Sequence, residues 1–169
     1  MIAALRRQEG FVAARVGIGD MKTSRDPCTV LETIGLGSCV GIAAWDPKTG
    51  IGGMLHYMLP LSSLNPARAQ ASPATFADTG VPLLFREMYA LGANKGDIVI
   101  KIAGGASLNA AMEMFSVGKR NLQVLKKMFD QNGFRVAAHD IGGSRSRTLR
   151  LAVGDGRVIV SSPGQEVEL

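Results

Sequence analysis

The stretch "TIGLGSCVGIAAWDPKTGIGGMLHYMLP", residues 33–60, decides how this chain is expected to fold. Two apolar runs, VGIAAW and IGGMLHYML, flank the segment DPKTG, in which Pro47 presets a turn and Gly50 supplies its left-handed exit. The pattern predicts a β-hairpin. Its two arms begin and end near Cys39 and His56, one of the two cysteines and one of the two histidines in the chain.

The register of this hairpin decides whether Cys39 and His56 can act together. We take Asp46 and Ile51 as the last pair before the turn. Gly41 then faces His56, and Cys39 lies two positions away on the same face of the sheet. A register shifted by two residues places the two side chains directly opposite each other, whereas a one-residue slip puts them on opposite faces. Either of the first two registers brings thiol and imidazole to one side.

Cys39 and His56 are the residue types that nucleophilic catalysis needs. A free thiol has a pKa of about 8.5, so a neighbouring imidazole that takes its proton creates a thiolate nucleophile. Thr33, six residues before the cysteine, offers a hydroxyl that fixes the tautomer of His56. The backbone N–H groups of the glycine-rich bend at Gly37 and Ser38 are candidates for an oxyanion-binding site.

The same residues also have a purely structural interpretation. A lone cysteine at the start of a strand is commonly a small buried side chain, and a lone histidine is commonly a hydrogen-bonded part of the core. The competing candidates are Cys28, in an expected strand without a glycine bend, and His139, near a turn; the sequence places no partner beside either. Two cysteines and two histidines fit no compact ligand spacing, so no metal site is expected.

Patterns outside the hairpin predict a domain that mixes strands and helices. Two helices are expected, one from the N-cap Asp78 to the stop at Gly92 and one over about residues 118–131, with a weaker helical stretch over residues 107–115. Further strands are expected over residues 14–20, 28–34, 97–103, 134–140, 146–153 and 157–162. The expected fold class is therefore α/β in the broad sense, of the mixed α+β type.

The chain is expected to form one domain over residues 1–169, because 169 residues with 46% hydrophobic and 20% charged content suit a single globular core. The basic N-terminal segment, residues 1–12, is expected to be a tail. Residues 61–77 are rich in Ala, Ser and Pro and show neither the helical nor the strand period. They are expected to form a long surface loop.

Composition and charge argue against several classes of protein. The net charge of +5 and the pI near 9.6 favour acidic partners. Aromatic residues do not alternate with basic ones as they do in single-strand binders, so nucleic-acid binding is not expected. No stretch approaches the ~20 apolar residues of a membrane-spanning helix, so direct membrane insertion is not expected. Two cysteines and an N-terminus without an apolar signal segment predict a cytoplasmic protein.

Several blocks of the sequence fit one family pattern. They are the signature at residues 33–60, ADTGVPLLFREMYALGA as a first long helix, KIAGGASL as a strand with a Gly-Gly-Ala turn, VGKRN at the start of a second helix, and HDIGGSRSR as a late glycine turn. In this order they cover most of residues 13–161 and resemble the CheD family, the chemoreceptor glutamine deamidases of bacterial chemotaxis. The departures are Ser146 before Arg147, where the family commonly has glycine, and a longer segment after Pro60.

The resemblance implies a cysteine hydrolase with a triad of Cys39, His56 and Thr33 and no cofactor. It implies a mixed β-sheet sandwich with flanking helices, similar to the catalytic domain of a deamidating bacterial cytotoxin. The implied reaction, a step of signal transduction, converts glutamines on the cytoplasmic helices of methyl-accepting receptors to glutamates, and some members also hydrolyse receptor methyl esters. Some members bind the phosphatase CheC, so the alternative is a non-catalytic module that docks CheC or receptors.

Overall fold

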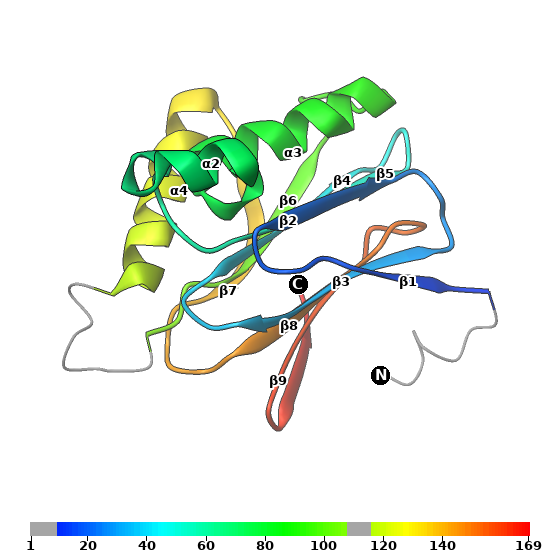
Figure 1. Ribbon diagram of the computed structural model, residues 1–169. Helices are drawn as coiled ribbons and strands as arrows, with labels where there is room; N and C mark the ends of the chain where they lie inside the picture. The colour runs from blue at the N-terminus through cyan, green and yellow to red at the C-terminus, as the bar shows by residue number, and fades with distance from the viewer. Residues whose placement is uncertain (1–9, 108–115) are drawn as a thin grey trace.

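Two five-stranded sheets stack face to face, and helices cover the outer face of one of them (Figure 1). The computed structural model describes residues 10–107 and 116–169. Sheet A has the order β1 (Val12–Arg15), β3 (Thr29–Leu36), β8 (Arg147–Ala152), β9 (Val158–Ser162), β10 (Gln165–Glu168). Sheet B has the order β2 (Asp20–Ser24), β5 (Ile51–Tyr57), β4 (Val40–Asp46), β6 (Val99–Gly104), β7 (Val136–Ile141). The predicted mixed α+β sandwich with flanking helices is confirmed.

Both sheets mix parallel and antiparallel strands. β1 pairs with β3 and β6 with β7 in parallel, and the other neighbours run antiparallel. The helices α3 (Ala77–Leu91) and α4 (Val117–Asn132) lie on the face of sheet B that points away from sheet A (Figure 1). Among the described residues, no helix combines the length and the apolar character needed to cross a membrane.

β4 and β5 form the predicted hairpin in the predicted register. Asp46 pairs with Ile51, and Gly41 pairs with His56. The N–H of Gly50, whose φ is 69°, donates to the carbonyl of Asp46 at 2.9 Å and closes the turn. Because side chains alternate along a strand, one face of the hairpin points to the helices and the other to sheet A.

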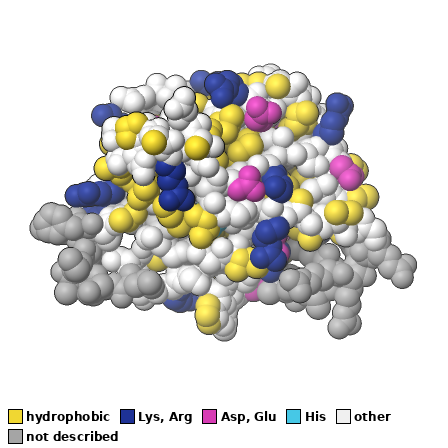
Figure 2. Space-filling view, in the orientation of Figure 1, with side chains coloured by type: hydrophobic (Ala, Val, Ile, Leu, Met, Phe, Trp, Pro, Cys, Tyr) yellow, Lys and Arg dark blue, Asp and Glu magenta, His cyan; other side chains and the backbone are white. Residues whose placement is uncertain are grey.

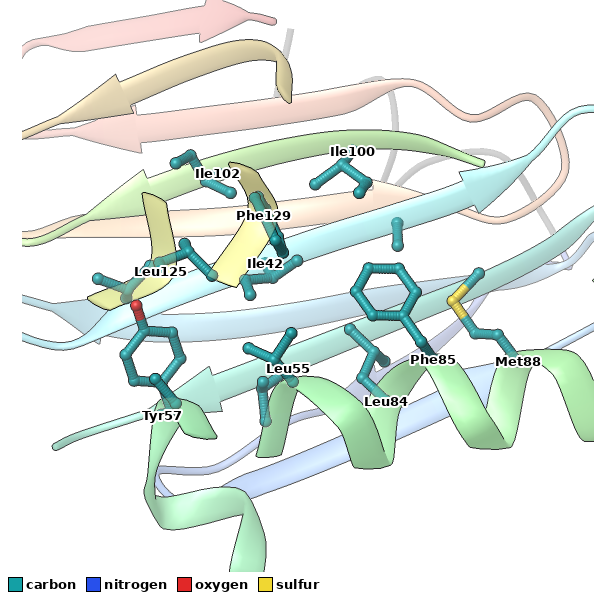
Figure 3. Packing of buried hydrophobic residues seen from close by; sticks show 14 of the residues in the cluster. Ile42, Leu55, Tyr57, Leu84, Phe85, Met88, Ile100, Ile102, Leu125 and Phe129 are labelled. Atoms are coloured by element: carbon teal, nitrogen blue, oxygen red, sulfur yellow. The ribbon is translucent and has the colours of Figure 1, made fainter. Parts of the chain in front are cut away.

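The two faces of sheet B carry separate apolar layers. On the helix side, Ile42 and Leu55 belong to one buried cluster with Leu84 and Met88 of α3 and with Leu125 and Phe129 of α4 (Figure 3). A Cβ at Gly53 would lie 2.9 Å from atoms of both Leu84 and Met88, so glycine allows α3 to pack closely on β5. The layer between the sheets is formed by Leu31, Leu36, Leu149, Leu151 and Val158 of sheet A and by Cys39, Ala43, Met54 and Ala103 on the side of sheet B.

The positive net charge is not gathered into one patch on the face shown in Figure 2. On this face, the described Lys and Arg side chains are spread over the surface and interspersed with acidic and apolar ones. Electrostatic attraction toward an acidic partner on this face would therefore be diffuse.

The segment predicted as a surface loop, residues 61–77, contains short helices, so that prediction is corrected. The helices are η1 (Ser62–Leu64), α2 (Pro66–Ala71) and η2 (Pro73–Thr75). The side chain of Asn65 caps α2 by accepting from the N–H of Arg68 at 3.0 Å, and residues 74–77 are buried. Helices of this length span less than two turns, so they cannot display the 3.6-residue period that identifies a helix from sequence.

Two other boundaries also differ from the predictions. The strand expected over residues 14–20 is divided between β1 and β2, which lie in different sheets, and the chain turns at Gly19 with φ 69°. α3 begins at Ala77 without a side-chain cap. Asp78, the expected N-cap, instead accepts from the N–H and the hydroxyl of Ser62, both at 2.8 Å, and so ties η1 to α3.

Two predictions fall largely outside the described residues. Residues 1–9 make up most of the predicted tail, and residues 108–115 make up most of the weaker helical stretch. Within the described part, Val12 begins β1 and pairs with Thr29 of β3.

Candidate active site

His56 and Thr33 connect the two sheets by one hydrogen bond. His56 lies near the end of β5 in sheet B, and Thr33 lies on β3 in sheet A. The imidazole Nδ1 and the threonine Oγ1 are 2.7 Å apart, and both residues are fully buried. The histidine is therefore held from the opposite sheet.

The second hydrogen bond of Thr33 fixes the tautomer of His56. Thr33 Oγ1 is 2.7 Å from the carbonyl oxygen of Val16, which can only accept. The single hydroxyl proton is donated there, so Oγ1 accepts the proton on Nδ1 of the imidazole. In the neutral ring, Nε2 then carries a lone pair, and it has no hydrogen-bond partner among the described residues. Nε2 of His56 is therefore a buried atom that is free to accept a proton.

Cys39 lies in the bend between β3 and β4, and this bend is held by the turn after β6. The N–H of Gly105 donates to the carbonyl of Cys39, and the N–H of Ala106 donates to the carbonyl of Gly37, each at 2.8 Å. Gly104 has φ 108°, and a Cβ there would lie 2.2 Å from the Cys39 carbonyl oxygen. The Gly-Gly-Ala turn therefore shapes the cysteine bend.

Cys39 and His56 lie on the same face of sheet B, as predicted. Cys39 is two residues before Gly41, the partner of His56, and its side chain belongs to the apolar layer between the sheets. Its neighbour Val40 belongs to the layer on the helix side. Diagonal cross-strand positions of this kind are within reach of long side chains.

Burial keeps both candidate groups neutral in the free protein. It lowers the pKa of His56 from 6.5 to about 4, because a charged imidazolium would lose its hydration between the sheets. Burial also raises the pKa of the Cys39 thiol, and the backbone N–H of Cys39 opposes this effect. The resting pair is therefore thiol and neutral imidazole. The free protein therefore does not hold Cys39 as the thiolate considered from the sequence.

The bend offers few free donors for an oxyanion. The N–H of Gly37 donates to the carbonyl of Gly35 at 2.9 Å, so an oxyanion role for Gly37 requires this bond to open. The N–H of Cys39 lies near its own sulfur. The assignment of Gly37 and Ser38 to an oxyanion-binding site stays a prediction.

The competing candidates, Cys28 and His139, lie on other elements than Cys39 and His56. Cys28 is exposed just before β3. His139 lies on β7, the edge strand of sheet B, two strands away from β4. Among the described residues, no three His, Cys, Asp or Glu side chains are arranged to hold a metal ion.

Sequence reasoning missed two supports of the bend: the turn at Gly104 and Gly105, and the buried Asn121 of α4, whose side-chain amide donates to the carbonyl of Ser38 at 2.9 Å. Both occur in blocks that the family resemblance singled out, KIAGGASL and VGKRN. No periodicity or spacing connects either block to Cys39, because the turn contacts the bend through backbone groups and the amide of Asn121 donates to backbone carbonyls, one of them in the bend.

The fold and the site together define a class of protein. It is a two-sheet α+β domain in which a histidine with one free nitrogen lies between the sheets, on the same face as the cysteine bend. The family model CheD, described as chemotactic sensory transduction, matches residues 58–162. The chain belongs to the CheD family.

Two curated relatives illustrate this membership. "Probable chemoreceptor glutamine deamidase CheD 2" of Anaeromyxobacter dehalogenans is 49% identical over 154 residues, covering 91% of this chain and 97% of its own length. "Probable chemoreceptor glutamine deamidase CheD" of Solibacter usitatus is 44% identical over 154 residues, 91% of each chain. Among solved structures, Neisseria meningitidis protein NMB0706 matches with a TM-score of 0.44 and 8% identity over 85% of this chain and 67% of that chain, a likeness too low to carry an argument.

Proposed function

We propose that this protein is a protein-glutamine deamidase that converts glutamines on the cytoplasmic helices of methyl-accepting chemotaxis receptors to glutamate and ammonia. Relatives that share 44–49% identity are named as probable chemoreceptor glutamine deamidases. The observation that carries the proposal is the unprotonated Nε2 of His56, which Thr33 orients on the same face as Cys39. We place the reaction in the cytoplasm, where free thiols such as Cys28 and Cys39 persist.

In the first half of the proposed reaction, the thiol of Cys39 becomes attached to the substrate. Nε2 of His56 takes the thiol proton while the sulfur attacks the side-chain amide carbon, and the carbonyl electron pair moves onto oxygen. Backbone N–H groups of the bend from Gly37 to Cys39 stabilise this oxyanion. The imidazolium then gives its proton to the amide nitrogen, the carbon–nitrogen bond breaks, and ammonia leaves a thioester.

In the second half, water replaces the sulfur. Nε2 of His56 takes a proton from water, whose oxygen attacks the thioester carbon. The carbon–sulfur bond breaks, the proton returns to the thiolate of Cys39, and glutamate is released. One water is consumed and one ammonia is formed, so the cycle balances without a change of oxidation state.

The low pKa of His56 suits the acid step of this cycle. An imidazolium whose pKa is about 4 is a strong proton donor toward the departing nitrogen. Thr33 supplies orientation without the negative charge that an aspartate would add, so it stabilises the imidazolium less than an aspartate would. Hydrolysis of receptor methyl esters and docking of CheC stay predictions.

The test is incubation with a cytoplasmic fragment of a methyl-accepting receptor, followed by ammonia measurement and peptide mass mapping. We expect selected glutamines to change to glutamate with the wild-type protein and with Cys28→Ala, the matched control at the exposed cysteine. Conversion by Cys39→Ala at the wild-type rate would reject Cys39 as the nucleophile. Binding of receptor or CheC without any conversion by the wild type would instead favour the docking module.

A further inference from the structure

The side chain of Asn121 connects the cysteine bend to the strand that carries His56. Its amide Nδ2 is 2.9 Å from the carbonyl oxygen of Ser38 and 2.9 Å from that of Met58. Ser38 precedes Cys39, and Met58 lies two residues after His56. One amide group therefore contacts the backbone on both sides of the candidate catalytic pair.

The orientation of this amide is not ambiguous. Both partners are backbone carbonyls, which can only accept, so the NH2 group and not the oxygen must face them. Asn121 is fully buried, although asparagine is a residue type that is seldom fully buried. Both donors of the amide are used next to the site, whereas its Oδ1 is buried and has no hydrogen-bond partner among the described residues.

The rest of α4 fixes the position of Asn121. A Cβ at Gly118, one turn before Asn121, would lie 2.4 Å from the carbonyl oxygen of Ala106, so the start of α4 docks closely on the turn that holds Cys39. The hydroxyl of Tyr57, the residue after His56, donates to the backbone carbonyl of Asn121 at 2.9 Å. The start of the helix is therefore tied to the bend and to β5 independently of the side chain of Asn121.

We propose that Asn121 is a positioning residue, whose amide sets the spacing between the bend that carries Cys39 and the end of β5 that carries His56. The expected effect of Asn121 on kcat rests on the proposed function. The spacing itself is a property of the free protein, because neither contact of the amide involves substrate. Asn121 acts through the backbone and touches no reacting atom.

The sharpest variant is Asn121→Asp, which is isosteric and directs carboxylate oxygens at two carbonyl oxygens. Asn132→Asp is the matched control, since it makes the same change at the exposed far end of α4. With a receptor fragment as substrate, we expect Asn121→Asp to lower kcat about 100-fold, the cost of a displacement of about 1 Å, and to leave KM unchanged. Asn121→Ala, which removes the donors without adding charge, is the second variant.

A double-mutant cycle separates positioning from a general structural role. The rate of Cys39 alkylation by iodoacetamide is measured in a Cys28→Ser background for His56→Gln, Asn121→Asp and both together. If Asn121 acts by setting the spacing between Cys39 and His56, each single change should slow alkylation about tenfold. The double variant should then be no slower than either single variant, because both changes remove the same effect of His56 on Cys39. Asn121→Ala is carried through the same cycle.

Two outcomes would overturn the inference. One is alkylation of both Asn121 variants at the rate of Asn132→Asp. The other is simple addition of the two effects in the double variant, as expected for unrelated sites. Because alkylation needs no receptor, a protein that deamidates nothing but shows the non-additive cycle would reject the proposed function while supporting the role of Asn121.

Discussion

Glu32 and Thr33 are consecutive residues of β3 that point to opposite faces of sheet A, and their surroundings differ in one respect. The carboxylate of Glu32 lies 3.2 Å from Arg15 of β1 and 2.5 Å from Arg150 of β8. These are its direct cross-strand neighbours, and Glu32 is buried. Thr33 points to the layer between the sheets and contacts His56, whose Nε2 has no partner among the described residues.

The difference separates the ion pairs of Glu32, which stabilise the fold, from the Thr33–His56 contact, which belongs to the candidate active site. On the Glu32 side, each carboxylate oxygen has a cationic partner, and Arg150 also donates to Ser161 at 2.9 Å. On the Thr33 side, Nε2 of His56 is buried without a hydrogen-bond partner among the described residues. A buried polar atom of this kind costs stability, so its presence indicates a functional role. Loss of the Glu32 ion pairs should therefore lower stability, and loss of the Thr33–His56 contact should lower activity.

The largest expected effect is on the Thr33 side of the comparison. Cys39→Ala removes the sulfur and should lower ammonia release from receptor fragments about 10³-fold or more. The free energy of unfolding should change by no more than about 1 kcal/mol, because alanine fills most of the volume of this small side chain. Ammonia release and urea denaturation measure the two quantities. Residual activity within tenfold of the wild type would contradict the assignment.

His56→Gln should lower the same rate about 10²–10⁴-fold and should also remove a pH dependence of stability. The pKa of His56 is about 4 in the folded protein and 6.5 as the ordinary value, so below pH 6.5 the unfolded chain binds a proton that the folded protein does not. Stability is therefore lost as the pH falls from 6.5 to about 4. The contribution is about 3 kcal/mol, since each pKa unit corresponds to about 1.4 kcal/mol.

Urea unfolding at pH 7 and at pH 4 tests this dependence. The wild type should lose about 3 kcal/mol more than His56→Gln between these two values, because carboxylates that titrate in the same range are common to both proteins. Equal losses would mean that His56 titrates in the folded protein near its ordinary pKa, which would contradict the lowering of this pKa by burial.

Arg150→Met probes the Glu32 side and should have the opposite profile. It removes one of two cations from a buried carboxylate, and Arg15 remains, so we expect a loss of about 2–3 kcal/mol of unfolding free energy. The kcat per folded molecule should stay within about twofold of the wild type, since the cluster lies on the face of sheet A away from His56. A loss of kcat without a loss of stability would show that the two faces are coupled.

The parts of this comparison that could be predicted from sequence are the local ones. Pro47 and Gly50 define a turn, and the two-residue period of the flanking strands fixes the register that puts Cys39 and His56 on one face. The hydrogen bond between Thr33 and His56 depends on how two sheets stack, which no period in the sequence encodes. The six-residue spacing before Cys39 and the family resemblance both pointed to Thr33, but neither gave the geometry of its contact.

Other features escaped prediction because their signals are short or because they are carried by the backbone. Helix α2 has six residues, too few to show a period. Asp78 has the residue type of an N-cap, but its carboxylate accepts from Ser62 instead of from its own helix. Asn121 contacts carbonyl groups at Ser38 and Met58, and any residue type presents a carbonyl, so side-chain patterns could not indicate these partners.

Of the three candidate catalytic residues, Thr33 should have the smallest effect on kcat, and its variants test whether the orientation of His56 matters for the rate. Thr33→Val keeps the shape of the side chain but leaves Nδ1 of His56 without an acceptor and the carbonyl of Val16 without a donor. The tautomer with the proton on Nε2 then becomes equally available, and that tautomer cannot accept a proton from Cys39. We expect kcat to fall about tenfold and stability to fall by about 1–3 kcal/mol.

Thr33→Ser is the matched control, since it keeps the hydroxyl and loses only a methyl group. It should retain most of the wild-type kcat while losing about 1 kcal/mol of unfolding free energy for the buried methyl. If Thr33→Val and Thr33→Ser lowered kcat equally, packing would explain the effect and the hydroxyl would have no role in orienting His56. If serine preserved the rate and valine did not, the hydrogen bond across the two sheets would be what distinguishes Thr33 from its neighbour Glu32.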